Sequence, residues 1–164
     1  MKIRVGFSFL VFNALLFMFR DSRLIAGFYI ACIVHELGHI AVIRLTGGRV
    51  RGMELSCFGI GITASPSHDI RTGVMVLLGG PLADLLLYAV LKACGMTGWT
   101  SMFCLAEGLF NLLPFSSLDG GAVLELLISG SPHEYILNKI IFCLRALLIS
   151  CGIVCAAWFI FSCK

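Results

Sequence analysis

The chain has 164 residues, of which 59% are hydrophobic and 13% are charged, and its formal net charge is +3. Soluble domains carry about 25% charged residues, so this composition predicts an integral membrane protein and excludes an ordinary water-soluble domain. Its length predicts one bundle, with residues 1–164 as a single domain. The basic residues lie mostly between apolar runs, so they mark membrane topology and not a surface for nucleic acid.

The first apolar run covers residues 3–19. It lies where a signal peptide would lie, but the residues from Phe17 to Asp21 offer no small-residue cleavage site. We therefore predict that it is an uncleaved first membrane span. Residues 24–45 are the second predicted span, because the run has about the 20 residues that a transmembrane helix needs.

The second span contains His35-Glu36-Leu37-Gly38-His39, which has the form H-E-x-x-H. On a helix, His35 and His39 share one face, and their imidazoles can both bind one Zn²⁺ at ~2.0–2.1 Å. Glu36 lies about a third of a turn away, close enough to take a proton from a water molecule held by the metal. Ionisable groups within hydrocarbon are costly and indicate a functional site by default. The less specific alternative is a polar contact between helices.

Residues 49–63 differ from the spans because glycine and β-forming residues predominate there. They predict a short membrane-associated β-hairpin, whose free edge could accept an extended substrate by strand addition. A plain connecting loop is the alternative. His68 and Asp69 follow in a turn, where solvation is the simpler interpretation than metal binding.

Residues 70–94 are the third predicted span, and they include Gly79-Gly80-Pro81 with Asp84 one turn later. A Gly-Gly-Pro sequence bends a helix and lets a neighbouring backbone come close. The sequence therefore predicts that another membrane helix packs tightly at this point.

The fourth predicted span begins with residues 101–113, is interrupted at Pro114 and continues to Ile128. Irregular backbone at membrane depth is tolerated where it is buried or lines a cavity, so residues 114–121 are predicted to line the cavity of the metal. Glu107 lies within this span, where we expect a polar contact with another span. Residues 136–163 are the fifth predicted span.

Five spans allow the depths of the polar residues to be compared. The positive-inside rule places the N-terminus and the more basic loops in the cytoplasm. His35 and His39 then lie in the cytoplasmic half of the second span, and Asp119 lies late in the fourth span, which runs in the same direction. Asp119 is therefore predicted to be the third metal ligand. Three protein ligands leave a fourth position for water, as in catalytic zinc sites.

Three motifs, at residues 35–39, 79–84 and 111–121, together resemble the site-2 protease family of intramembrane zinc metalloproteases. The resemblance implies a three-helix metalloprotease core over residues 24–128. It implies further outer helices, as in the bacterial branch that includes the sporulation protease acting on a pro-sigma factor. It also implies that His35, His39 and Asp119 hold one zinc ion, while Glu36 is the general base and then the proton donor.

The resemblance further implies a set of substrate contacts. Asn111 would orient the substrate or polarise its carbonyl, the hairpin would dock the substrate strand, and Gly80, Pro81 and Pro114 would contribute to binding. One departure is Asp84, where relatives usually have Asn; it is predicted to be protonated or paired with Arg145. The other is that no PDZ or cystathionine-synthase-type domain follows, so we expect a separate membrane protein to be the regulatory partner.

The sequence as a whole predicts an all-α membrane protein of about five transmembrane helices with a short hairpin. Its predicted activity is hydrolysis of a peptide bond in or near the transmembrane segment of a membrane-tethered protein, such as a transcription or sigma factor precursor. Its predicted location is the bacterial cytoplasmic membrane, with the lipid bilayer around it and the active site toward the cytoplasm. The alternatives are a non-catalytic metal-binding scaffold of the same fold and, with less support, a small metal transporter.

Overall fold

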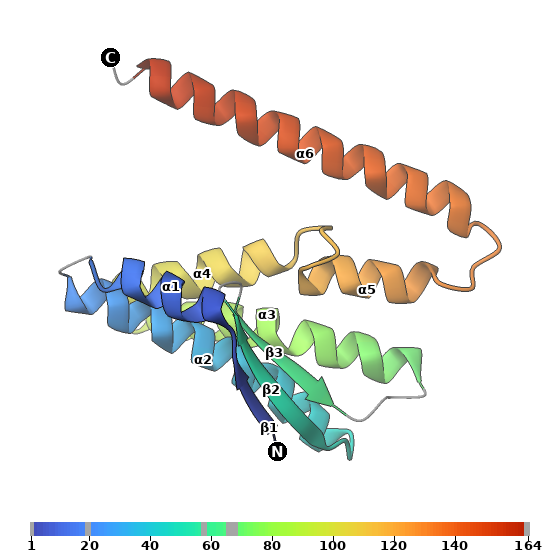
Figure 1. The fold of residues 1–164 in the computed structure, drawn as a ribbon, viewed down its shortest axis with the longest axis horizontal. Helices are drawn as coiled ribbons and strands as arrows, with labels where there is room; N and C mark the ends of the chain where they lie inside the picture. The colour runs from blue at the N-terminus through green and yellow to red at the C-terminus, as the bar shows by residue number, and fades with distance from the viewer. Residues whose placement is uncertain (1, 19–20, 57–58, 65–68, 163–164) are drawn as a thin grey trace.

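The computed structural model describes residues 2–18, 21–56, 59–64 and 69–162, which form a bundle of helices with a short sheet at one side (Figure 1). The elements in chain order are β1 (Lys2–Val5), α1 (Phe7–Leu16), α2 (Ser22–Leu45), β2 (Val50–Ser56), β3 (Gly59–Ala64), α3 (Ile70–Ala93), α4 (Trp99–Asn111), α5 (Asp119–Ile128) and α6 (Glu134–Ser162).

Helices α2, α3 and α4 pack against one another and form the core. The buried face of α2 repeats every four residues, which keeps one stripe of the helix turned inward. Residues of this stripe are Gly27, Ala31, His35, His39 and Ile43. Because the two histidines belong to the stripe that holds the core together, the polar motif lies inside the helix bundle and not on its lipid-facing surface.

Two glycines allow α2 and α3 to approach closely. A Cβ atom at Gly38 would overlap the carbonyl oxygen of Gly79, and a Cβ atom at Gly79 would lie 2.8 Å from the carbonyl oxygen of Gly38. Small residues at such crossings let the backbones of membrane helices come together. Since Gly38 lies between His35 and His39 in the sequence, this crossing places both histidines beside α3.

The three strands form one sheet in the order β1-β2-β3. Strands β2 and β3 pair in antiparallel fashion, with Met53 opposite Ile62, so the predicted hairpin is confirmed. Strand β1 was not predicted; it pairs in parallel with β2, with Ile3 opposite Met53. A parallel pair needs a long crossover connection, which α1 and α2 provide. Strand β2 is therefore central, and β3 lies at an edge.

Three helices in the described part of the chain are long and apolar enough to cross a membrane: α2, α3 and α6. The all-helical membrane class is thus confirmed, but five continuous spans are not found. The first predicted span is divided between β1 and α1, whose 10 residues rise about 15 Å, half of the ~30 Å hydrocarbon core. The fourth is divided into α4 and α5 by the turn at residues 112–118, which contains Pro114, where the sequence predicted an interruption.

Helix α6 extends beside the rest of the molecule and is joined to it through α5 (Figure 1). The Arg145 guanidinium donates hydrogen bonds to the carbonyl oxygen of Pro114 and, at 3.3 Å, to Glu125. The predicted pair of Arg145 with Asp84 is therefore wrong, because Asp84 is fully buried on α3 against His35. The apolar surface of α6 is left available to lipid, since none of its membrane window is buried within the molecule.

We expect Gly79→Val to destabilise the fold, because its side chain would push against the backbone of α2 at Gly38. Overpacking of this kind costs about 1–3 kcal/mol, and occasionally more. The measurement is the free energy of unfolding in detergent, followed by circular dichroism during titration with a denaturing detergent. Gly152→Val is the matched control, because a Cβ atom at Gly152 on α6 meets nothing within 4 Å. Equal stability of the two variants would contradict the close crossing.

Candidate metal centre

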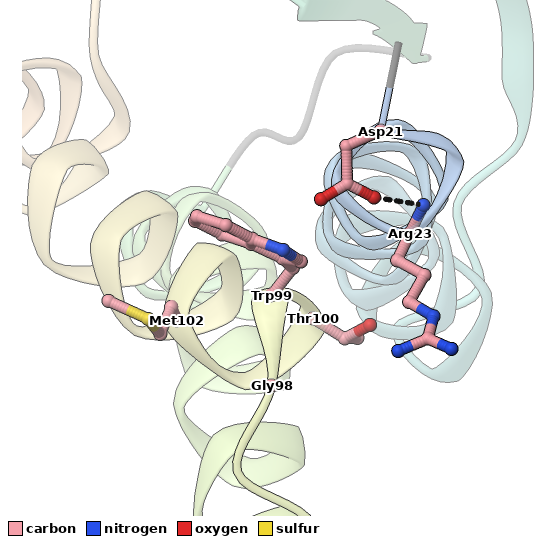
Figure 2. Close-up of a pocket in the computed structure, with 6 residues that line it drawn as sticks. All are labelled: Asp21, Arg23, Gly98, Trp99, Thr100 and Met102. Carbon is pink, nitrogen blue, oxygen red and sulfur yellow. Dashed lines mark hydrogen bonds between the residues drawn. The ribbon is translucent and has the colours of Figure 1, made fainter. Parts of the chain in front are cut away.

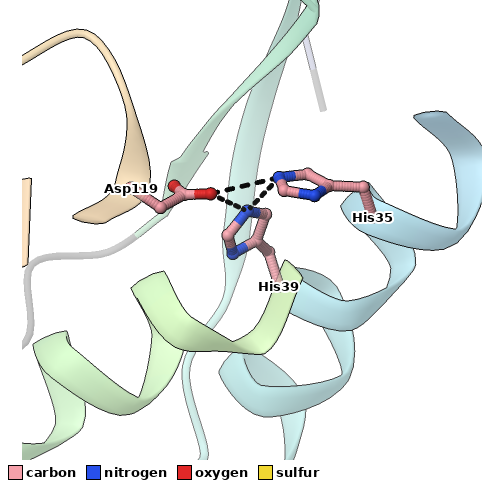
Figure 3. A group of neighbouring side chains, drawn as sticks. All are labelled: His35, His39 and Asp119. Atoms are coloured by element: carbon pink, nitrogen blue, oxygen red, sulfur yellow. Dashed lines mark hydrogen bonds and ion pairs between the residues drawn. The ribbon is translucent and has the colours of Figure 1, made fainter. Parts of the chain in front are cut away.

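Three side chains from two separate parts of the chain meet in the core: His35 and His39 from α2, and Asp119 from the start of α5. Figure 3 shows the two imidazole rings and the carboxylate directed toward one another. Nε2 of His35 lies 3.1 Å from Nε2 of His39 and 3.1 Å from Oδ2 of Asp119, and Nε2 of His39 lies 3.3 Å from the same oxygen. These three atoms, the donor triangle, form a nearly equilateral group.

The donor triangle has the size that zinc requires. Tetrahedral zinc binds nitrogen and oxygen at about 2.0–2.2 Å, so two of its ligands lie about 3.3–3.5 Å apart. The observed separations of 3.1–3.3 Å are close to this range. Gly80 leaves the space free, because a Cβ atom there would overlap Nε2 of His39 and lie 2.7 Å from Nε2 of His35. The residues present therefore fit a zinc ion with three protein ligands and one open position.

The turn between α4 and α5 delivers Asp119 to the histidines. Its backbone folds back on itself, with the Leu118 N–H donating to the carbonyl oxygen of Phe115 at 2.8 Å. A Cβ atom at Gly121 would overlap the same carbonyl group, so glycine is required where the turn lies against α5. Asp119 is the first residue of α5, and a carboxylate is favoured there because the helix N-terminus carries partial positive charge.

Each histidine also bonds to α3 through its second ring nitrogen. Nδ1 of His35 lies 2.7 Å from Oδ2 of Asp84, and Nδ1 of His39 lies 2.7 Å from the carbonyl oxygen of Val76. If Nε2 of each ring faces the metal, Nδ1 carries the hydrogen and donates it to these acceptors. The contact of Asp84 with His35 was missed by the sequence reasoning. One signal was available, since Asp84 lies one helical turn after Gly80.

Glu107 adds a second carboxyl group behind His35. Ligand atoms of His35, Asp84 and Glu107 all lie within 4.8 Å of one another, so α2, α3 and α4 each contribute one of them. The polar contact between spans that was expected for Glu107 is therefore present. Within this group Asp84 bonds to Nδ1 of His35, whereas Asp119 lies against Nε2.

The other predicted site residues are placed as follows. Glu36 is buried on α2, next to His35. The Asn111 side-chain amide donates to the carbonyl oxygen of Glu107 at 3.2 Å, within its own helix. Pro81 is fully buried in α3, and the Pro114 carbonyl oxygen accepts the hydrogen bond of Arg145. The structure thus brings the predicted metal residues together with Gly80, while the substrate contacts of Asn111, Pro81 and Pro114 stay predictions.

A surface pocket of about 520 Å³ lies at the far end of α2, where α2 and α4 begin (Figure 2). Its lining includes Asp21, Arg23 and Trp99. The Asp21 carboxylate accepts hydrogen bonds from the backbone N–H groups of Arg23 and Leu24, so it caps α2. This pocket lies over three helical turns from His35 along α2 and is not the candidate metal centre.

The comparisons with known proteins agree with this arrangement. The family model described as Peptidase M50B-like matches residues 8–118, which include both histidines and end one residue before Asp119. A candidate zinc metalloprotease of Synechocystis sp. is 31% identical over 124 residues, covering 66% of this chain and 33% of that protein. The candidate zinc metalloprotease Rip3 of Mycobacterium tuberculosis is 32% identical over 109 residues, covering 57% of this chain and 28% of Rip3. The chain therefore spans about a third of the length of these curated relatives.

A solved structure has the same fold. The site-2 protease from Methanocaldococcus jannaschii superposes with a TM-score of 0.66 over 93% of this chain and 82% of that chain. The sequences are 21% identical, so the likeness concerns the arrangement of the elements.

We expect His39→Ala to weaken zinc binding strongly, because it removes one atom of the donor triangle. The loss should exceed the roughly 10–100-fold that is typical when only a hydrogen-bond partner of a ligand is removed. Zinc affinity in detergent, measured by competition with a coloured chelator, checks this. His133→Ala is the control, because His133 is exposed in the loop before α6. Equal affinity of the two variants would show that the donor triangle is not the zinc site.

Proposed function

This chain belongs to the Peptidase M50B-like family, and we propose that it is an intramembrane zinc metalloendopeptidase. The observation that carries the proposal is the donor triangle of His35, His39 and Asp119, buried among apolar helices with the Glu36 carboxyl group next in sequence to the first ligand. A set of ligands of the right size for a metal, inside a membrane protein and next in sequence to a candidate base, suits the hydrolysis of a peptide bond away from bulk water.

In this proposal His35 and His39 would hold zinc through Nε2, and Asp119 would hold it through one carboxylate oxygen. Bound zinc supplies a Lewis acid, which polarises a peptide carbonyl and lowers the pKa of a water molecule. Nδ1 of each ring lies against an acceptor on α3, so it is Nε2 of each ring that faces Asp119. The protein therefore holds its ligands ready before any substrate arrives.

Glu36 takes the proton from the attacking water molecule and later gives it to the departing amine. Its position on α2, directly after His35, keeps the carboxyl group at the same depth as the donor triangle. The side chain is 9% exposed, so bulk water is largely excluded from it. Charges in such a site interact more strongly than charges in water, which favours the transition state of hydrolysis.

The substrate is a membrane-tethered protein that is cut in or near its transmembrane segment. A helical substrate hides its carbonyl groups in hydrogen bonds, so the segment must unwind before a peptide bond can be attacked. Strand β3 supports this step, because it forms one edge of the sheet and contacts α2. The opposite edge is formed by β1, on the other side of β2. The substrate path is completed by Asn111, Gly80, Pro81 and Pro114. Gly80 leaves space beside the histidine nitrogens.

The membrane is the bacterial cytoplasmic membrane, and the active site is turned toward the cytoplasm. The parallel pairing of β1 with β2 supports one part of this, because it places the N-terminus on the same side as the basic hairpin. A transcription or sigma factor precursor is the substrate that the resemblance to the sporulation protease favours. A membrane protein is the expected regulator of the cleavage.

We expect Glu36→Gln to keep zinc and to lose turnover. The amide fills the same space but accepts no proton, and general acid–base catalysis contributes about 10²–10⁴-fold in rate. The measurement has two parts: zinc content of the purified protein, and the full-length membrane proteins that accumulate when each form is expressed in bacterial membranes. A protein that builds up intact only with Glu36→Gln identifies the substrate.

Glu134→Gln is the matched control, because Glu134 lies at the exposed start of α6 and bonds only locally, to the Gly130 N–H. It should cleave as the wild type does. Cleavage that persists in Glu36→Gln would remove Glu36 from the mechanism. If the wild type and Glu36→Gln both hold the same partner intact, the non-catalytic scaffold is the better description of the protein.

A further inference from the structure

Asp84 is the most deeply buried carboxyl group in the described part of the chain. Its side chain is 0% exposed on α3, and ligand atoms of His35 on α2 and Glu107 on α4 lie within 4.8 Å of it. Its Oδ2 atom lies 2.7 Å from Nδ1 of His35, while its Oδ1 atom is buried without a hydrogen-bond partner in the described residues. A carboxyl group at this depth is costly, so a strong interaction must favour its presence.

The two histidines differ in the acceptor that holds them. His39 donates from Nδ1 to a neutral backbone carbonyl, that of Val76, whereas His35 faces a carboxyl group at the same 2.7 Å distance. Hydrogen bonds to an ionised acceptor are roughly twice as strong as those between neutral groups. The backbone carbonyl of Val76 is present whatever the side chain is, but the acceptor for His35 exists only because residue 84 carries it.

The side of His35 that faces Asp84 is opposite to the side that faces the metal position. Nδ1 and Nε2 of one imidazole ring cannot both be free acceptors at once in the neutral ring, because one of them carries the hydrogen. An acceptor at Nδ1 therefore keeps the hydrogen there and leaves the lone pair of Nε2 for a ligand. It also fixes the rotation of the ring about its χ2 angle.

We infer that Asp84 is a positioning residue, which holds His35 in the tautomer and orientation that bind zinc through Nε2. The inference rests on the proposed function, since it assigns Asp84 a role toward the metal of that same site. Asn at this position could accept the same hydrogen bond through its side-chain carbonyl oxygen. Leu has the same number of side-chain heavy atoms but offers no acceptor.

The first experiment compares zinc affinities of the full-length protein in detergent, by competition with a coloured chelator. Asp84→Leu should bind zinc about 10–100-fold more weakly, as is typical when the partner of a ligand is lost. Asp84→Asn should recover most of that loss, because it restores the acceptor. Cys104→Ala is the control for packing alone, since Cys104 is fully buried on α4 in the same core; its affinity should stay within about twofold of the wild type.

The second experiment observes the hydrogen bond directly and does not require Asp84→Leu to fold. Proton and nitrogen NMR of the zinc-loaded protein, labelled at its 4 histidines, reports each Nδ1 hydrogen. In the wild type the His35 Nδ1 proton should resonate further downfield than that of His39, which faces a neutral carbonyl. Asp84→Asn should move the His35 proton upfield and leave the His39 proton in place.

The outcomes separate this inference from the proposed function. A folded Asp84→Leu that binds zinc as tightly as the wild type would overturn the positioning role and leave the zinc site intact. Two Nδ1 protons that are both unmoved in Asp84→Asn would overturn it as well. A wild-type protein that binds no zinc would instead remove the proposed function, and the inference with it.

Discussion

Both histidines of α2 are tied to α3 by hydrogen bonds from Nδ1, and the geometry of the whole site depends on this pair of bonds. A buried polar hydrogen without an acceptor costs about 1–3 kcal/mol, and lipid offers no acceptor in its place. Helix α3 must therefore lie within hydrogen-bond distance of two successive turns of α2. Such closeness is impossible with side chains between the backbones, which is why Gly38 and Gly79 meet at the level of the histidines.

The same requirement extends to the residues that close the site. Gly80 has no side chain where the Nε2 atoms of both rings converge, and Gly121 has none where the turn before α5 lies against the helix. Each glycine removes volume at a place where a backbone or a ring must approach. As a result, Asp119 reaches the histidines from a part of the chain 80 residues beyond His39. The polar site and the close packing of the helices thus depend on each other.

Much of this arrangement could be predicted from local sequence. His35 and His39 are four residues apart on one helix, and Asp119 could be placed at their depth from the direction of the spans. The hairpin at β2 and β3 was visible in its glycine and β-forming residues. Strand β1 was not, because four residues carry no usable signal when their pairing partner lies 50 residues away and depends on tertiary contact.

Two further errors have a common cause. The apolar run of residues 3–19 predicts one span, because its hydropathy does not reveal that the chain changes from strand to helix at Gly6. Of the two alternatives that the sequence leaves for Asp84, protonation or a pair with Arg145, neither includes its bond to His35. In both cases the outcome is decided by what packs against the residue from a distant part of the chain. Hydropathy and charge indicate the free-energy cost of placing a side chain in lipid, but they do not indicate which partner residue offsets that cost.

The charges around the donor triangle show why a carboxyl group at position 84 is tolerated in this chain. A divalent cation held by His35, His39 and Asp119 would have only one of its two charges balanced by a ligand, and in a low-dielectric interior the remaining charge is costly. Asp84 lies directly behind His35 and supplies a second carboxyl group within one imidazole ring of the metal position. With Asn at this position the ring would still be held, by a weaker hydrogen bond to a neutral acceptor, but the positive charge would be left for Glu36 or the substrate to balance. Replacing Asp84 by Asn would therefore change the electrostatics of the site more than its shape.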